Sequence, residues 1–86
     1  MHYVYILKSQ TTGNYYTGET NNLQRRIYEH NNNKSFATRG RGPWEIIYIE
    51  KYKTPKEAKQ REYKIKKKKR KSYIEWLINN KYGPVV

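Results

Sequence analysis

The sequence predicts a small α+β domain whose elements follow the order strand, strand, helix, strand, helix, helix. β-branched and aromatic residues fill three short segments, and these residue types favour strands. Residues suited to helix capping precede three other segments. The chain has 86 residues, a length that suits one domain over residues 1–86.

The first two strands are expected to form a hairpin. The first covers residues 3–8 and the second residues 15–19, with turn-forming residues at 10–14 between them. Gly18 lies inside the second strand. A glycine in that position indicates either a bulge or the close approach of another group to the backbone.

The third strand is expected over residues 44–52, where apolar side chains fall on both faces. Ile46 and Tyr48 are expected on one face, and Ile47 and Ile49 on the other. A strand that is apolar on both sides is usually buried on both sides. We therefore expect other elements to cover both faces.

The first helix is expected to begin at Asn21, a good capping residue, with a glutamine three residues later to complete a capping box. Leu23, Ile27 and His30 then share one face. The run of asparagines at 31–33 is expected to end the helix.

Both later helices are expected to begin at capping boxes. Residues 54–57 carry T-x-x-E, with a proline at the first helical position. Residues 72–75 carry S-x-x-E, so a break is expected near Lys71. The last helix is expected to reach about Asn80, with Gly83-Pro84 terminating it.

Charge is the strongest compositional signal. Nineteen basic residues face seven acidic ones, giving a net charge of +12, and residues 51–71 hold twelve of the basic and two of the acidic residues. Such a field attracts polyanions, of which DNA and RNA are the commonest. A solvated, solubilising helix face is the alternative. No membrane partner is expected, because this segment has almost none of the residues that insert into lipid.

The absence of cysteine excludes disulfides and thiolate metal sites, and the cytoplasm is the expected compartment. The apolar run near the N-terminus, residues 3–7, is too short for a signal-peptide core or a membrane span.

Five sequence features occur in a fixed order along the chain. Tyr3-Val4-Tyr5 lies on the first expected strand and Tyr16-Thr17-Gly18 on the second. Arg26 and His30 form R-x-x-x-H on the first helix, and Glu62 lies within the second. This set resembles the GIY-YIG nuclease superfamily, especially its small stand-alone bacterial proteins of poorly defined role, over nearly the whole chain.

The resemblance implies a three-stranded antiparallel sheet flanked by helices. It also implies hydrolysis of a phosphodiester with one divalent cation, Mg²⁺ or Mn²⁺. The motif tyrosines, the helix arginine and the glutamate would then meet on one side of the sheet. DNA is expected more than RNA as the substrate.

Glu62 is the expected metal ligand. It shares the apolar face of its helix with Ala58 and Ile65, where a carboxylate needs a partner. Mg²⁺ or Mn²⁺ would bind this one carboxylate, waters and phosphate oxygens. A salt bridge to Arg26 or to a lysine is the alternative. A single protein ligand argues against a two-metal mechanism.

The expected catalytic residues are Tyr5, Tyr16, Arg26 and His30. Arg26 would grip a phosphate, or remain a surface cation. His30 would contact the phosphate or shuttle a proton, or serve a structural role. The resemblance makes Tyr16 the general base or water-orienting group, with Tyr5 positioning the water or the Tyr16 hydroxyl; sheet packing is the alternative for both. A free phenol has a pKa near 10, so a tyrosine base needs neighbouring cations.

One position departs from the family pattern. Many members that cut nucleic acid carry a lysine three residues after the second-motif tyrosine, where this chain has Glu19. Either that cation is dispensable, or another lysine replaces it, or catalysis is weakened. Asn80 is a candidate for a family asparagine near the last helix, and Asn79 fits as well.

Nucleic-acid contacts are expected from the loop before the third strand and from the basic second helix. The candidates are Lys34, Arg39, Arg41, Lys59, Lys66, Lys67, Lys69 and Arg70. The expected function is therefore that of a metal-dependent endonuclease. The alternatives are a non-catalytic nucleic-acid-binding module on the same scaffold and an adaptor for a protein partner of unknown identity.

Overall fold

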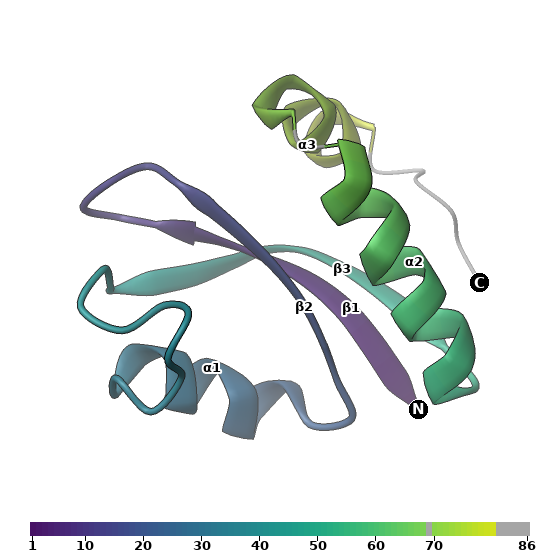
Figure 1. Cartoon of the computed structure of the whole chain (residues 1–86), viewed down its shortest axis with the longest axis horizontal. Coiled ribbons are helices and arrows are strands. Elements are labelled where there is room, and N and C mark those ends of the chain that lie inside the picture. The colour runs from purple at the N-terminus through teal and green to yellow at the C-terminus, as the bar shows by residue number, and fades with distance from the viewer. Residues whose placement is uncertain (69, 81–86) are drawn as a thin grey trace.

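The computed structural model of the chain describes residues 1–68 and 70–80, with six elements in the predicted order (Figure 1). They are β1 (His2–Ser9), β2 (Tyr15–Thr20), α1 (Leu23–Asn31), β3 (Trp44–Tyr52), α2 (Pro55–Lys68) and α3 (Lys71–Asn79). The strands form one antiparallel sheet in the order β2-β1-β3. Helix α1 lies on one face, and α2 and α3 lie on the other (Figure 1). The predicted fold class is confirmed.

The central strand β1 supplies the middle of both cores, because its side chains alternate between the two faces of the sheet. Val4 and Ile6 are fully buried on the side of α2 and α3. Tyr5 and Leu7 are buried on the side of α1, where Trp44 completes the cluster. Both faces of the sheet are covered, as the third strand predicted, although Ile49 on that strand is 43% exposed.

Strands β1 and β2 form the predicted hairpin, with Tyr5 opposite Gly18. A Cβ atom at Gly18 would lie 2.3 Å from the Tyr5 hydroxyl oxygen. That is far inside van der Waals contact, so only glycine leaves room for the phenol ring to lie across β2. Of the two predicted reasons for a glycine here, the close approach is the one observed.

Strand β3 has a bulge at Ile47, because its neighbours Ile46 and Tyr48 pair with consecutive residues of β1. Ile46 packs on the α1 side of the sheet, whereas Ile47 and Tyr48 both pack on the α2 and α3 side. The prediction that Ile46 and Tyr48 share a face is therefore wrong, since strict alternation fails at a bulge.

Side-chain caps set the starts of the first two helices. The cap of α1 is Asn22 rather than the predicted Asn21, and its side chain accepts a hydrogen bond at 3.0 Å from the backbone N–H three residues later. Helix α2 begins at Pro55, as predicted. The hydroxyl of Thr54 accepts from the Glu57 backbone N–H at 3.2 Å.

Helix α3 begins at Lys71, two residues earlier than the S-x-x-E pattern indicates. Ser72 therefore lies inside the first turn, and the cap residue Arg70 makes no side-chain capping bond. The predicted stop signal, Gly83-Pro84, lies outside the described residues. None of the described helices combines the length and the apolar character needed to cross a membrane.

A buried ion pair ties α2 to β3. Glu50 is 4% exposed and accepts two hydrogen bonds from Arg61, at 2.9 and 3.1 Å. The hydroxyls of Tyr48 and Tyr52 each donate to the same carboxylate at 2.6 Å. Burial, with the carboxylate, raises the pKa of both hydroxyls, so both remain donors. The pair fixes the rotation of α2 and hence the direction of Glu62, the next residue along the helix.

Candidate active site along the edge strand β2

Tyr5 lies at the centre of a hydrogen-bonded cluster between β1 and α1. Its side chain is 2% exposed. Arg26 Nε donates to the hydroxyl oxygen at 3.3 Å, and His30 Nε2 lies 2.9 Å from the same oxygen. Burial raises the pKa of Tyr5 to about 12, although the hydrogen bond and charge of Arg26 oppose the rise. This phenol is therefore protonated at neutral pH and acts as a hydrogen-bonding group.

His30 is buried, and both of its ring nitrogens have partners within the fold. Besides the contact with Tyr5, Nδ1 lies 2.7 Å from the Thr38 hydroxyl. Burial, followed by the charge of Arg26, lowers the pKa of His30 to about 4, so the ring is neutral at pH 7. The ring also packs against Tyr16, with centroids 5.1 Å apart. This placement favours the structural role over direct contact with a substrate.

The guanidinium of Arg26 is held on three sides. Besides Tyr5, it donates to Glu29 through Nη1 at 2.9 Å and to the Ser35 hydroxyl through Nη2 at 3.5 Å. Burial lowers the pKa of Arg26, but the bonds with Glu29 and Tyr5 raise it by more, so the cation is permanent. Phosphate and carboxylate compete for the same guanidinium donors. A phosphate that binds Arg26 would therefore compete with Glu29 for these donors.

Helix α2 brings Glu62 and Lys66 to the β2 side of the sheet. Lys66 Nζ lies 2.7 Å from Glu62 Oε2 and 5.6 Å from the centroid of the Tyr16 ring. Through its salt bridge with Lys66, Glu62 is linked to the side chain that lies over the Tyr16 ring. The salt bridge that was the alternative role of Glu62 is thus present, with Lys66 rather than Arg26 as the partner.

The two motif tyrosines differ in their surroundings. The Tyr5 hydroxyl is fixed by two partners, whereas the Tyr16 hydroxyl has no hydrogen-bond partner among residues 1–68 and 70–80. Tyr16 is also only half-buried. Its hydroxyl is therefore the one that can meet a water molecule or a substrate.

The side chains present fit one hard divalent cation. Within the described ranges no three His, Asp or Glu side chains gather in one place. Glu62 alone, with waters and phosphate oxygens, is a ligand set that Mg²⁺ accepts. Its carboxylate already holds one cation, the Lys66 ammonium, at 2.7 Å. A ligand set with one carboxylate suits a single metal ion.

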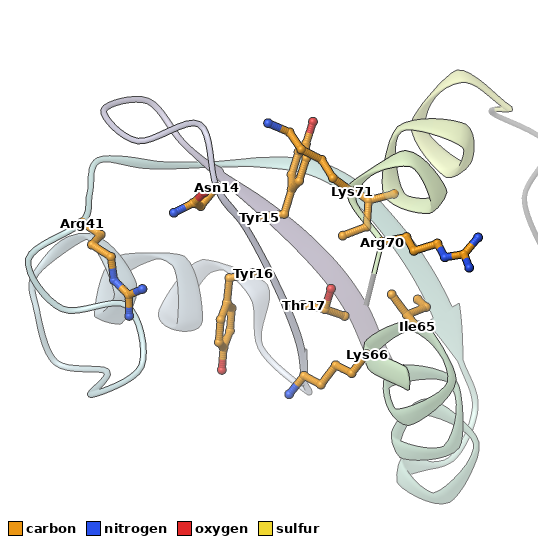
Figure 2. A pocket seen from close by; sticks show the side chains of 10 residues that line it. Asn14, Tyr15, Tyr16, Thr17, Arg41, Ile65, Lys66, Arg70 and Lys71 are labelled. Atoms are coloured by element: carbon orange, nitrogen blue, oxygen red, sulfur yellow. The ribbon is translucent and has the colours of Figure 1, made fainter. Parts of the chain in front are cut away.

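A groove of about 470 Å³ runs along β2, with Arg41 at one end and Arg70 and Lys71 at the other (Figure 2). Lys66 reaches in between them, and its side chain extends from α2 toward Tyr16 (Figure 2). The groove is lined by Asn14, Tyr15, Tyr16, Thr17, Arg41, Ile65, Lys66, Arg70, Lys71 and Ile74. All four charged side chains in this lining are cationic, so the groove suits a polyanionic strand.

The other predicted nucleic-acid contacts lie elsewhere. Lys34 and Arg39 are exposed on the loop between α1 and β3. Lys59 and Lys67 are exposed on a different face of α2 and do not line the groove. Lys69 lies outside the described residues. Of the predicted cations, the groove thus brings together Arg41, Lys66 and Arg70.

Two further candidate site residues, Glu19 and Asn80, contact residues close to them in the fold. Glu19 lies opposite Val4 and therefore faces the α2 side of the sheet, where its carboxylate lies 2.8 Å from His2 Nδ1. Asn80 follows the end of α3, where its side chain donates to the Trp76 carbonyl at 2.9 Å. Neither contact joins the Tyr5 cluster.

The structure brings four further residues to the site. Ser35 and Thr38 come from an irregular loop, where no periodicity marks a buried position. Glu29 had a signal, since it follows Arg26 by three positions on a predicted helix. Lys71 was part of the basic run, but its place in the groove depends on where α3 begins.

The sequence profile of the GIY-YIG catalytic domain family matches residues 1–82. The chain is 48% identical over 82 residues to the UPF0213 protein CPE1444 of Clostridium perfringens, covering 94% of this chain and 86% of that protein. It is 39% identical over 84 residues to the UPF0213 protein YazA of Bacillus subtilis, covering 93% and 84%. The solution NMR structure of the UPF0213 protein BH0048 from Bacillus halodurans shares its fold, with a TM-score of 0.58 and 38% identity over 96% of this chain and 87% of that one. The chain therefore belongs to the GIY-YIG family of nuclease domains.

Proposed function

We propose that the protein is an endonuclease that hydrolyses phosphodiester bonds of DNA with one bound Mg²⁺ or Mn²⁺ ion. The observation that carries the proposal is that Arg26 bonds to the buried Tyr5 hydroxyl, while Lys66, the salt-bridge partner of Glu62, lies over the Tyr16 ring. The GIY-YIG family indicates nuclease chemistry, which is generally metal-dependent. The cytoplasm, where bacterial DNA lies, is the proposed compartment.

In this mechanism the cut strand lies in the groove along β2. Arg41, Lys66, Arg70 and Lys71 neutralise its phosphates from both ends and from the middle of the groove. Arg26 binds a non-bridging oxygen of the scissile phosphate in place of Glu29, and so stabilises the charge that grows there.

Tyr16 orients the attacking water and takes its proton as the water oxygen bonds to phosphorus and the bond to the leaving oxygen breaks. A negative charge on the phenol is stabilised by Lys66, whose ammonium lies 5.6 Å from the ring. Lys66 thus supplies from α2 the cation that many relatives carry at the position of Glu19.

Glu62 is the proposed metal ligand, and the cation that it holds would polarise the phosphoryl group and stabilise the leaving oxygen. With Glu62 holding a metal ion, Lys66 would lose its salt-bridge partner and become available to Tyr16 and the substrate. His30 touches no substrate in this mechanism. It is a positioning residue that acts through Tyr5.

The test compares Glu62→Gln with Glu57→Gln, an exposed control near the start of the same helix that preserves the capping pattern. Purified proteins are incubated with duplex, nicked, branched and single-stranded DNA in Mg²⁺ or Mn²⁺. We expect Glu62→Gln to lower the cleavage rate by about 100-fold or more, with metal-free binding unchanged. The control should cut like the wild type.

Two outcomes would favour the alternative functions. A wild type that binds DNA but cuts none of the substrates with either metal is a nucleic-acid-binding module. A protein adaptor would bind DNA weakly, with little dependence on salt. Six phosphate contacts would instead lower the affinity about 10³-fold between 50 and 200 mM salt.

A further inference from the structure

The loop between α1 and β3 presents an aromatic ring beside the proposed active site. Ser35 and Thr38 are buried and are bonded to Arg26 and His30, at 3.5 and 2.7 Å. Between them, Phe36 is 87% exposed, the highest value among the large hydrophobic side chains in the described part of the chain. The backbone is thus held in place on both sides of Phe36, whose ring hardly packs against the core.

Cations surround this ring. The guanidinium carbon of Arg39 lies 5.5 Å from the Phe36 centroid. Arg41 donates to the carbonyl of Ala37, the residue after Phe36, and also lines the groove along β2. An exposed ring flanked by cations next to a basic groove is the arrangement with which proteins hold single-stranded nucleic acid, because every base has a face that can stack.

We propose that Phe36 stacks on an unpaired nucleobase close to the cleaved bond, so that the protein prefers strands with unstacked bases over continuous duplex. The inference rests on the proposed function only in that nucleic acid lies in the groove. Phe36 follows Ser35, whose hydroxyl accepts a hydrogen bond from Arg26, so the stacked base lies close to the phosphate that Arg26 binds.

The reason for the preference is geometric. In a paired duplex both faces of a base are covered by its neighbours in the stack, and only base edges reach the grooves. A loop, bulge, flap or single strand leaves a base face open to a protein ring. Phe36 therefore adds affinity only where a base is already out of the stack or is easily taken from it.

The test measures binding by fluorescence anisotropy without divalent metal, so that no cleavage occurs. The probes are a short single strand and a duplex with unpaired bases, each carrying 2-aminopurine, and the same duplex fully paired. Phe36→Ala is compared with Phe36→Trp and with Tyr28→Ala, which removes another exposed aromatic ring, from α1.

We expect Phe36→Ala to weaken binding of the first two probes roughly 5- to 150-fold, with the paired duplex nearly unchanged. The salt dependence should be unaltered, since no phosphate contact is lost. Phe36→Trp should bind like the wild type and quench 2-aminopurine, whereas Phe36→Ala should not quench it.

Three results would overturn the inference. Phe36→Ala could bind as tightly as the wild type, it could lose the same affinity for all three probes, or Tyr28→Ala could lose as much affinity as Phe36→Ala. A loop that docks on a protein instead would show the first of these results. A wild type that binds with the expected preference yet never cuts would refute the nuclease proposal and leave this inference standing. A wild type that binds no probe would refute both.

Discussion

Replacing Gly18 with alanine tests whether the position of Tyr5 holds the active-site cluster together. The new Cβ would lie 2.3 Å from the Tyr5 hydroxyl oxygen and 2.5 Å from Cζ, whereas ordinary contact begins near 3.4 Å. The phenol would have to retreat by about 1 Å. Its bonds to His30 and Arg26, at 2.9 and 3.3 Å, leave little room for such a shift.

The cost of this substitution combines two effects. Overpacking of a buried site costs about 1–3 kcal/mol, and each weakened hydrogen bond costs about 1 kcal/mol. We expect Gly18→Ala to lower the free energy of unfolding by about 2–4 kcal/mol and the melting temperature by roughly 10–25 °C. Cleavage should fall about 100-fold, since a misplacement of this size disturbs the reacting groups.

Urea and thermal unfolding, followed by circular dichroism, measure the stability, and a gel assay measures cleavage. Tyr5→Leu provides the matched background, because the shorter side chain lacks the atoms that meet the new Cβ. In that background Gly18→Ala should cost less than about 1 kcal/mol. An equal cost in both backgrounds, or a melting temperature lowered by less than about 3 °C in the wild type, would refute the reasoning.

Three more outcomes follow from the buried and partly buried charges. The pKa of His30 is about 4 in the folded protein and about 6.5 when unfolded, so the unfolded chain takes up the proton first. Stability should therefore fall by about 3 kcal/mol as the pH drops from 6.5 to 4, a slope that urea titrations should find reduced in His30→Gln. Glu50→Ala leaves Arg61 without its buried partner and should lower the free energy of unfolding by about 3–5 kcal/mol in the same assay; unchanged stability would contradict the role of this pair. Glu29→Gln removes the carboxylate that competes for Arg26, so DNA binding measured by anisotropy should tighten by at least about twofold; weaker binding would show that Glu29 assists the arginine.

Much of the fold could be predicted, because its signals are local. Aromatic and β-branched runs marked the strands, and Thr54 and Pro55 marked the start of α2. The bulge at Ile47 could not be predicted, because it depends on pairing with β1. The pairing of Glu50 with Arg61 could not be predicted either, because the sequence does not indicate which basic residue lies next to an acidic residue of a strand.

The sequence predicts candidate site residues, but it does not predict how the surroundings of those residues differ. Tyr5 and Tyr16 look alike in the sequence, and only burial and the contact of His30 with Thr38 show that one is fixed and the other open. The lysines of α2 point in many directions around the helix. Only the rotation set by Arg61 brings Lys66 to the groove.

The division of the site between distant parts of the chain has a consequence for synthesis on the ribosome. The tyrosines, the arginine and the histidine of the cluster all occur within the first thirty residues, whereas Glu62 arrives only with α2. On the proposed mechanism, a growing chain that has already paired β1 with β2 still lacks its metal ligand. On that mechanism, cleavage of DNA begins only after the second helix has emerged from the ribosome and docked on the sheet.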